Sequence, residues 1–514
     1  MRHARPLAAM PLLDAEPHAA GGGGAGGGAA LPRNVDIDGG DSCPRSASLE
    51  LATFEEAKKE HGLGFGSPVA GALILANTLL GGSGMLGISH AVSVSGWALG
   101  LVLIFVFGCC SAFGSHLLQC SARRIGAAPC SFYSVASAVV PNWTWLIDGA
   151  VMIKCFGVGT SYLIIVGDLA PDAMHFFGAH GAKRWHAIIA GFCCGGLLAC
   201  QKNLSALRYT ALLSVLIVSW TAVLIVLFFS GLGGVFDPCT VESPAAYMAA
   251  AAAIGPVESP TVARAATLEV LMAGSEALPC YDAEFRPVAV PDFLKLGKAL
   301  PVFIFAFTCQ QNVFTVCNEV REASCRRMDG MIVSSYLFSG LAFAASAILS
   351  YATYGNKIDS DMLKGYPKGG PVQLTRLLFA MLATFSFPMQ VHPSRNSALA
   401  LWTMMRGPPG GSSSGQREVL TDPEAGRLRG ERQRFWICTV VGLVLSCAVA
   451  LSVESLGTML GVVGATGSTT VSYILPGLVY SMAFPDAGFK RALAFGQLGL
   501  GCIIMPTCLI MLFL

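Results

Sequence analysis

The sequence predicts an all-α polytopic membrane protein with about eleven transmembrane helices. Of its 514 residues, 54% are hydrophobic and only 12% are charged, whereas soluble domains carry about 25% charged residues. From about residue 68 onward, the hydrophobic residues gather in runs of roughly 20, the length that a helix needs to cross a lipid bilayer. The formal net charge is +2. A nucleic-acid binder would carry a strong basic excess, so no nucleic-acid partner is expected.

Two parts of the chain differ in composition. Residues 1–65 are rich in Gly, Ala and Pro and cannot bury a core, so they predict a disordered cytosolic tail. Residues 66–514 form the predicted transmembrane domain. Its spans are expected near 68–93, 97–121, 143–169, 185–201, 205–232, 299–318, 331–354, 371–392, 435–453, 456–482 and 492–514.

Basic residues decide the orientation of these spans. Lys and Arg are concentrated in alternate short loops, and the positive-inside rule places those loops in the cytosol. The N-terminus is then cytosolic and the C-terminus lies outside. Residues 233–298 become a large outside loop and residues 406–434 a flexible cytosolic loop. The outside loop contains Cys239 and Cys280, for which a disulfide and two free thiols remain equal alternatives.

The first span contains a run of small residues that weakens a helix. Asn77 is followed by Gly81, Gly82, Ser83 and Gly84. Unwound backbone at mid-membrane is tolerated only where it lines a cavity or is buried in protein. A close-packing glycine seam would give the same pattern, so the glycines alone favour a seam and a binding site equally.

The sixth span is interrupted by polar residues. Thr308 and the run Gln310, Gln311 and Asn312 lie within an otherwise apolar stretch, which costs several kcal/mol unless the polar groups are satisfied. Two interrupted spans that are five spans apart are typical of inverted-repeat transporters. The broken helices would meet at the midplane, where their N-termini offer N–H groups and a positive dipole end to a carboxylate.

The third span carries a lysine in the membrane. Lys154, Ser161 and Asp168 recur at intervals of seven and therefore share one helical stripe. An intramembrane lysine predicts a functional role, with a structural ion pair or a side chain that extends to the inside surface as alternatives. Asp168 lies near the outer end and is expected to be an interface residue.

The eighth span carries hydroxyl groups one turn before a proline. Thr384 and Ser386 precede Pro388, which removes a backbone hydrogen bond of the helix. The hydroxyls could bind the freed carbonyl group or a small cation.

These motifs resemble the amino acid/auxin permease family, which includes sodium-coupled neutral amino acid transporters and fungal vacuolar amino acid transporters. The first span matches the family pattern from Asn77 to Gly87, and the third span is similar to the vacuolar branch from Ile153 to Leu169. The sixth span ends in the expected Asn318-Glu319, and the eighth ends in Phe387-Pro388 followed by Pro393-Ser394-Arg395. The resemblance covers residues from about 66 to 514, apart from the 406–434 loop.

The resemblance implies a leucine-transporter-type fold, with two inverted repeats of five helices and one extra helix. It also implies secondary transport of amino acids driven by sodium or protons. Asn77 and Ser386, with Thr384 as the alternative, map to the residues that serve the cation in the sodium-coupled branch. Ser386 replaces the family's threonine, and Gln310 stands where most relatives have histidine. If transport is coupled to protons instead, Lys154 is the candidate for the residue that binds and releases the proton, because burial can lower the pKa of a lysine.

We therefore expect a cation-coupled transporter of neutral amino acids in the plasma membrane or a vacuolar or lysosomal membrane. Gly81, Gly82, Ser83 and Gly84 would bind the substrate carboxylate, and the predicted sixth-span contacts are Thr308, Gln311 and Asn312. No catalytic residue, organic cofactor or metal beyond sodium is expected. The alternative is an amino acid sensor of the same fold that signals without significant flux.

Overall fold

The computed structural model describes residues 68–81, 83–125, 132–179, 181–200, 208–230, 293–320, 324–355, 358–406, 423–486 and 488–514. These residues belong to one compact unit, Phe54–Leu514. The predicted tail 1–65, Gly82, Cys239 and Cys280 lie outside the described residues, as does nearly all of the predicted 233–298 loop.

The described part of the chain is helical and contains no strand. Its elements are α2 (Pro68–Leu80), α3 (Gly84–Ser95), α4 (Trp97–Ile125), α5 (Phe132–Val139), η1 (Pro141–Trp143), α6 (Thr144–Phe176), α7 (Arg184–Ala199), α8 (Arg208–Ser230), α11 (Phe293–Ala306), α12 (Gln310–Glu319), α13 (Cys325–Tyr354), η4 (Met362–Gly365), α14 (Gly370–Arg406), α15 (Pro423–Ser452), α16 (Leu456–Val463), η5 (Gly464–Ser468), η6 (Thr470–Ile474), α17 (Leu475–Ala483) and α18 (Gly488–Phe513). Among the described residues, nine candidate spans are long and apolar enough to cross a membrane, the bent pair α2–α3 is a tenth, and α7 is a shorter apolar helix. These candidates match the predicted spans, so the prediction of an all-α polytopic membrane protein is confirmed.

Several boundaries differ from the sequence-based expectation. Helix α14 continues to Arg406, so Arg395 lies within a helix rather than in the following loop. Its guanidinium donates to the Ala199 carbonyl over 3.2 Å and lies 4.1 Å from the centre of the Phe435 ring, which ties α14 to α7 and α15. Helix α15 begins at Pro423, so the end of the expected 406–434 loop is helical. Helix α5, before the third span, was not predicted.

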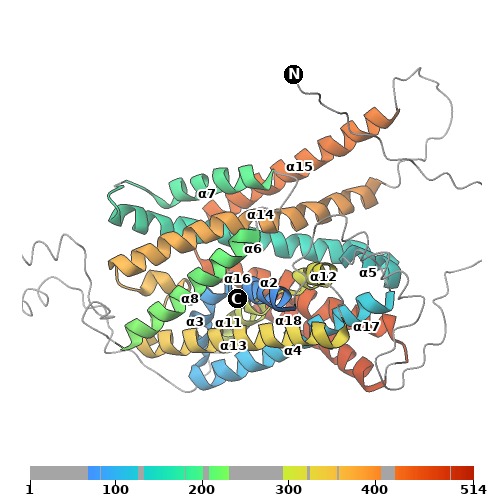
Figure 1. Ribbon diagram of the computed structural model, residues 1–514, viewed down its shortest axis with the longest axis horizontal. Coiled ribbons are helices and arrows are strands. Elements are labelled where there is room, and N and C mark those ends of the chain that lie inside the picture. The colour runs from blue at the N-terminus through green and yellow to red at the C-terminus, as the bar shows by residue number, and fades with distance from the viewer. Residues whose placement is uncertain are drawn as a thin grey trace, which may run out of the picture. The chain divides into compact units, whose positions relative to one another are not determined.

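The third and eighth spans form the most extensive contact between two helices of the described unit. Figure 1 shows α6 and α14 lying side by side, with α4 and α13 forming another such pair. Helix α13 also packs against α2 and α3, so the seventh span borders the first. The third and eighth spans, like the second and seventh, occupy equivalent places in two repeats of five.

The two broken spans pack against each other in crossed order. The first half of the first span, α2, contacts the second half of the sixth, α12, while α3 contacts α11. The half-helices therefore run antiparallel, with the two breaks beside each other. Two inverted repeats predict this arrangement.

The tenth span is wound more loosely at its centre than a regular α-helix. It begins as α16, continues through the π-helical segments η5 and η6, and ends as α17. Its glycines allow close packing: a Cβ on Gly464 would overlap the Pro301 carbonyl, and a Cβ on Gly457 would stand 3.0 Å from Ser360 Cβ. This side of the span is therefore a close-packing face. The π-helical segments were not predicted, and such segments occur often at functional sites.

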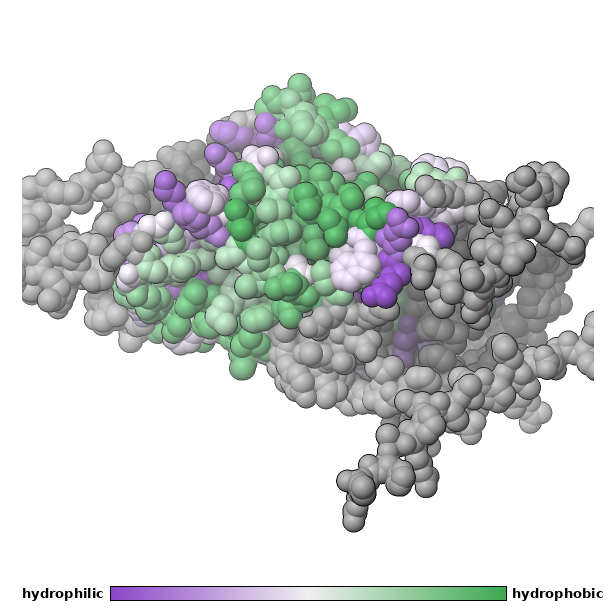
Figure 2. Space-filling view, turned by 90° about the horizontal axis from the view of Figure 1, so that it is seen from above, coloured by the Kyte–Doolittle hydropathy of each residue, from purple (hydrophilic) through white to green (hydrophobic). Residues whose placement is uncertain are grey.

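Large apolar side chains are exposed on the outer helices. Leu197 on α7 is 74% exposed and Val441 on α15 is 58% exposed. Figure 2 shows hydrophobic residues gathered across the middle of the face that these helices present, with hydrophilic residues toward its sides. A soluble protein rarely exposes apolar patches of this kind. A lipid bilayer provides the apolar surroundings that this face requires.

Candidate functional site

The first helix break is fixed to the third span. The last regular bond of α2 joins the Gly81 N–H to the Asn77 carbonyl over 2.7 Å, and α3 begins at Gly84 after a bend of 54°. Between them, Ser83 Oγ forms a hydrogen bond with Ser161 Oγ on α6 over 2.9 Å. The Ser83 side chain is therefore engaged in holding the break, which leaves its backbone as the group that could bind a substrate.

Because Gly84 has no side chain, the two breaks can lie close together. A Cβ on this residue would stand 3.0 Å from Ala306 Cα at the end of α11, so any side chain here would push the two half-helices apart. The N-terminal end of α3, which carries free N–H groups and a positive partial charge, therefore begins beside the point at which α11 ends.

At the second break, the predicted polar residues have different roles. Thr308 Oγ1 donates to the Ile304 carbonyl over 2.7 Å and accepts from Ser472 Oγ over 3.1 Å. Asn312 Nδ2 donates to Thr78 Oγ1 over 2.7 Å. Asn312 thus joins α12 to α2 and holds the two broken spans together, whereas Thr308 lies at the unwound segment itself.

Gln310 is the centre of a buried hydrogen-bond network that the sequence did not reveal. Its Nε2 donates to Ser111 Oγ over 2.7 Å and to Tyr336 OH over 3.2 Å, and its Oε1 accepts from Ser472 Oγ over 2.8 Å. The side chain is fully buried. The residue that replaces the family's histidine therefore connects α12 with α4, α13 and the π-helical segment of the tenth span.

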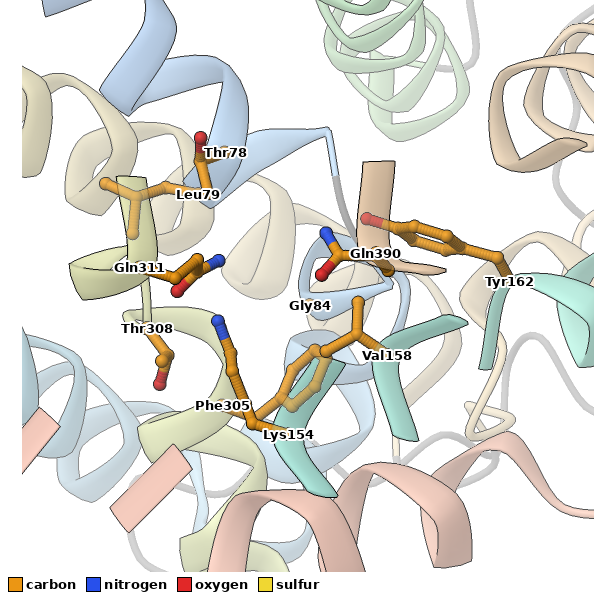
Figure 3. A pocket seen from close by; sticks show the side chains of 10 residues that line it. All are labelled: Thr78, Leu79, Gly84, Lys154, Val158, Tyr162, Phe305, Thr308, Gln311 and Gln390. Carbon is orange, nitrogen blue, oxygen red and sulfur yellow. The ribbon is translucent and has the colours of Figure 1, made fainter. Parts of the chain in front are cut away.

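A small polar cavity lies where the two breaks meet. The residues that line it come from α2, α3, α6, α11, α12, α14 and the segment between α11 and α12, and they are Thr78, Leu79, Gly84, Lys154, Val158, Tyr162, Phe305, Thr308, Gln311 and Gln390. Figure 3 shows Lys154 pointing toward the end of the cavity where Thr308 and Gln311 lie, and Tyr162 and Gln390 facing each other at the other end. The structure therefore brings together Gly84, Lys154, Thr308 and Gln311 of the predicted site residues.

Three polar atoms of this cavity have no hydrogen-bond partner within the described residues. They are Lys154 Nζ, Gln311 Oε1 and Gln390 Oε1. The Lys154 side chain is only 1% exposed, and the lining contains no Asp or Glu. An unpaired buried cation and unpaired buried acceptors are each unfavourable. Their combination in one cavity is suited to a small ligand that carries both a negative and a positive group.

The residues predicted to hold a cation have less direct support. Asn77 Oδ1 is buried without a hydrogen-bond partner in the described part of the chain, and a neutral oxygen of this kind fits a hard cation. Thr384 Oγ1 donates to the Ala380 carbonyl over 2.8 Å, and Ser386 is 8% exposed. No extensive contact joins the described parts of α2 and α14, so a cation site that includes all three residues remains a prediction.

A second, smaller cavity connects the first break with the eighth span. Its lining comprises Gly81, Tyr162, Ile165, Phe379, Leu382 and Ala383. None of the predicted oxygen ligands Asn77, Thr384 and Ser386 lines this cavity, so it adds no support to the cation site.

Charged residues form a network at the opposite end of α6 from Lys154. Asp168 pairs with Arg184 Nε and Lys364 Nζ, each over 2.9 Å, and Arg376 Nη1 contacts Asp172 Oδ2 over 3.1 Å. Asp168 is therefore part of an ion-pair network, and its expected place at the membrane interface stays a prediction. Because Arg184 and Lys364 lie in segments outside α6, these pairs hold the loop 358–366 and the start of α7 against the third span.

Within this network, Asp361 is a fully buried carboxylate in the segment between α13 and α14. Its Oδ1 accepts from the Leu363 N–H over 3.1 Å, while its Oδ2 has no hydrogen-bond partner among the described residues. Burial, and then the negative charge of Asp168, raise the pKa of this carboxyl to about 7.

Sequence reasoning missed Tyr162, Gln390 and Ser472. Ser472 lies in the tenth span, and Tyr162 lies within the matched third-span run. Gln390 follows Pro388 by two residues, and an amide in an apolar span beside a proline is the signal that could have identified it.

Comparisons with known proteins agree with this arrangement. The chain is 26% identical over 479 residues to vacuolar amino acid transporter 6 of Saccharomyces cerevisiae, covering 86% of this chain and 97% of that protein. It is 28% identical over 455 residues to vacuolar amino acid transporter 5 of Schizosaccharomyces pombe, covering 85% and 91%. It is 22% identical over 474 residues to sodium-coupled neutral amino acid transporter 4 of Homo sapiens, covering 82% and 79%.

The family described as transmembrane amino acid transporter protein matches residues 65–251 and 277–514. This match extends over most of the chain and confirms the family that the span motifs resemble. The chain belongs to the transmembrane amino acid transporter protein family.

Proposed function

We propose that this protein is a secondary active transporter that carries neutral amino acids across a membrane by using a sodium or proton gradient. The observation that supports it is the cavity between the two helix breaks. This cavity brings together the ammonium of Lys154 and two amide oxygens, none of which has a hydrogen-bond partner among the described residues. The carboxylate of a zwitterionic amino acid would pair with the ammonium of Lys154. Its own ammonium group would donate hydrogen bonds to the two amide oxygens.

The charge of the cavity lining favours amino acid substrates that have neutral side chains. The lining contains one basic residue and no acidic one. An amino acid with a cationic side chain would bring a further positive charge into a buried space without a partner, which is costly. The human relative that is named as a neutral amino acid transporter supports the same substrate class.

Two coupling ions fit different residues. Sodium would be held by Asn77 Oδ1 together with Ser386 or Thr384, because hard cations prefer neutral and anionic oxygens. Coupling to protons would require a titratable group in the membrane, for which Lys154 is the candidate. Relatives named as vacuolar and as sodium-coupled support a vacuolar, lysosomal or plasma membrane location.

Uptake by purified protein tests this function. The protein is reconstituted into proteoliposomes, and uptake of a panel of labelled amino acids is measured while the sodium and proton gradients are set independently. We expect accumulation of neutral amino acids that depends on one of the two gradients. If amino acids bind but do not accumulate under either gradient, the protein is a sensor and the transporter proposal is wrong.

A further inference from the structure

We propose that the Lys154 ammonium binds the α-carboxylate of the substrate, and that the amide oxygens of Gln311 and Gln390 accept hydrogen bonds from its α-ammonium group. This proposal rests on the amino acid transport proposed above and assigns the charged contacts of the same cavity.

The surroundings of Lys154 lack the partner that a structural lysine would need. Its side chain is 1% exposed, and its Nζ has no hydrogen-bond partner among the described residues. Among the described acidic residues of α6, Asp168 and Asp172 have basic partners of their own, and Asp148 forms a hydrogen bond with Ser397. A buried ammonium without a counter-ion is strongly unfavourable, so an anion that enters the cavity would offset this cost.

The backbone of Lys154 is held in place by close packing. A Cβ on Gly467 would stand 2.7 Å from both Lys154 Cα and Lys154 Cβ, so the π-helical segment η5 lies directly against this part of α6. A rigid support of this kind preorganises a binding group, because little conformational entropy is lost when the ligand is bound.

The first residue of α3 lines the same cavity. Gly84 is the N-terminal residue of a helix of 12 residues, so the positive end of the helix dipole lies at the cavity that Lys154 also lines. Two sources of positive potential therefore act on this cavity. A carboxylate placed there would be stabilised by the ammonium and by the N–H groups at the start of α3.

The acceptors for the amino group come from two other spans. Gln311 lies on α12 and Gln390 on α14, and the Oε1 atom of each is buried without a hydrogen-bond partner in the described structure. Figure 3 shows both amides at the cavity, with Gln311 close to the end of Lys154. An α-amino acid carries its carboxylate and ammonium on one carbon atom, so a substrate whose carboxylate is bound by Lys154 would present its ammonium to these amides within the same cavity.

The experiment compares each amino acid with its carboxamide, in which the carboxylate is replaced by a neutral group. Inhibition constants for both compounds are measured for the wild type and for Lys154→Met by competition with labelled substrate binding to purified protein. We expect the wild type to prefer the acid by about 10- to 100-fold, the effect of one charge-assisted hydrogen bond. In Lys154→Met, the ratio of the two inhibition constants should fall by about 10-fold or more, and any remaining preference for the acid would come from the N–H groups at the start of α3.

Lys490→Met is the matched control, because Lys490 is an exposed residue of α18 that lies outside the cavity. This variant removes the same charge from the protein and should keep the wild-type ratio. If Lys154→Met does not fold, Lys154→Gln replaces it, since glutamine retains a polar side chain of similar length. A reduced ratio in the Lys154 variant together with an unchanged ratio in the control supports the proposal.

An unchanged ratio in the Lys154 variant, or a wild type that does not distinguish the acid from the amide, overturns the proposal. In the first case, loss of proton-driven uptake in the same variant would assign Lys154 to coupling instead. If the wild type neither binds nor transports any amino acid of the panel, the proposed function itself fails. That result is obtained before any variant is made, so the two failures are distinguishable.

Discussion

Gly467 lies directly against the backbone of Lys154: a Cβ on this glycine would stand 2.7 Å from Lys154 Cα and 2.8 Å from Lys154 N. Backbone atoms cannot move aside as the end of a flexible side chain can. Gly467→Ala should therefore push α6 away from η5 and displace the cavity lysine. Overpacking of this kind costs about 1–3 kcal/mol, so we expect a lower melting temperature in detergent and a marked loss of substrate affinity.

Gly442→Ala provides the comparison for this change. Gly442 lies within α15, and a Cβ built there meets no atom within 4 Å. The substitution adds the same methyl group and should leave the melting temperature unchanged or slightly raised, because alanine favours helices more than glycine does. If Gly467→Ala and Gly442→Ala have the same melting temperature and the same substrate affinity, contact with Lys154 does not exclude a side chain at residue 467.

A second prediction concerns the amide that holds the sixth-span break. Gln310→Leu keeps a similar volume but removes the Gln310 amide from Ser472 Oγ and Ser111 Oγ, which keep their bonds to Thr308 Oγ1 and the Phe307 carbonyl. Each lost hydrogen bond contributes about 0.5–1.5 kcal/mol. We expect a decrease in melting temperature and slower uptake, because the break would be held less tightly against α4 and the tenth span.

Pairing this substitution with Ser472→Ala tests whether the two residues act as one unit. The double variant should be less destabilised than the sum of the two single variants, because residues of one hydrogen-bond network are not additive. Ser452→Ala, which removes an exposed hydroxyl that bonds only its own helix, should have little effect. Full additivity of Gln310→Leu and Ser472→Ala would contradict the network.

The spans could be predicted from the sequence because a bilayer imposes a simple requirement of length and apolarity. The two breaks were also predictable, since Gly81 to Gly84 and Gln310 to Asn312 contradict that requirement within otherwise apolar runs. The end of α14 was not, because Arg395 resembles a loop residue until its contacts with Ala199 and Phe435 are known.

The roles of individual polar residues could not be predicted in the same way. Gln310, Gln311 and Asn312 are neighbours of similar chemistry, yet they face different parts of the protein. Gln310 enters a buried network, Gln311 lines the cavity and Asn312 bonds Thr78. A helix turns by 100° at each residue, so consecutive side chains point in different directions and tertiary packing decides what each one meets.

The third prediction concerns the coupling ion. If Asn77 and Ser386 hold sodium, Asn77→Ala and Ser386→Ala should each raise the sodium concentration needed for half-maximal uptake. The double variant should be little worse than the worse single variant, because both residues would serve one site. Thr507→Val, which changes an exposed hydroxyl of α18, should leave the sodium dependence unchanged. Wild-type uptake that ignores sodium but follows a proton gradient would exclude this site.

The last prediction concerns Asp361, whose carboxyl has its pKa raised to about 7 by burial and by Asp168. The folded state then holds a proton that the unfolded chain, with a pKa near 3.8, has already lost. Stability should therefore fall as the pH rises between about 4 and 7, by at most about 1.4 kcal/mol per pH unit, and the full cost should be present above pH 7. Melting temperatures in detergent from pH 5 to pH 8 measure this slope.

The variant Asp361→Asn, which resembles the protonated carboxyl, should show a melting temperature that changes less with pH over this range, and it should be more stable than the wild type at pH 8. Asp486→Asn, which changes an exposed carboxylate in the turn before α18, should keep the wild-type slope. If Asp361→Asn keeps it as well, the burial of this carboxyl does not set the pH dependence.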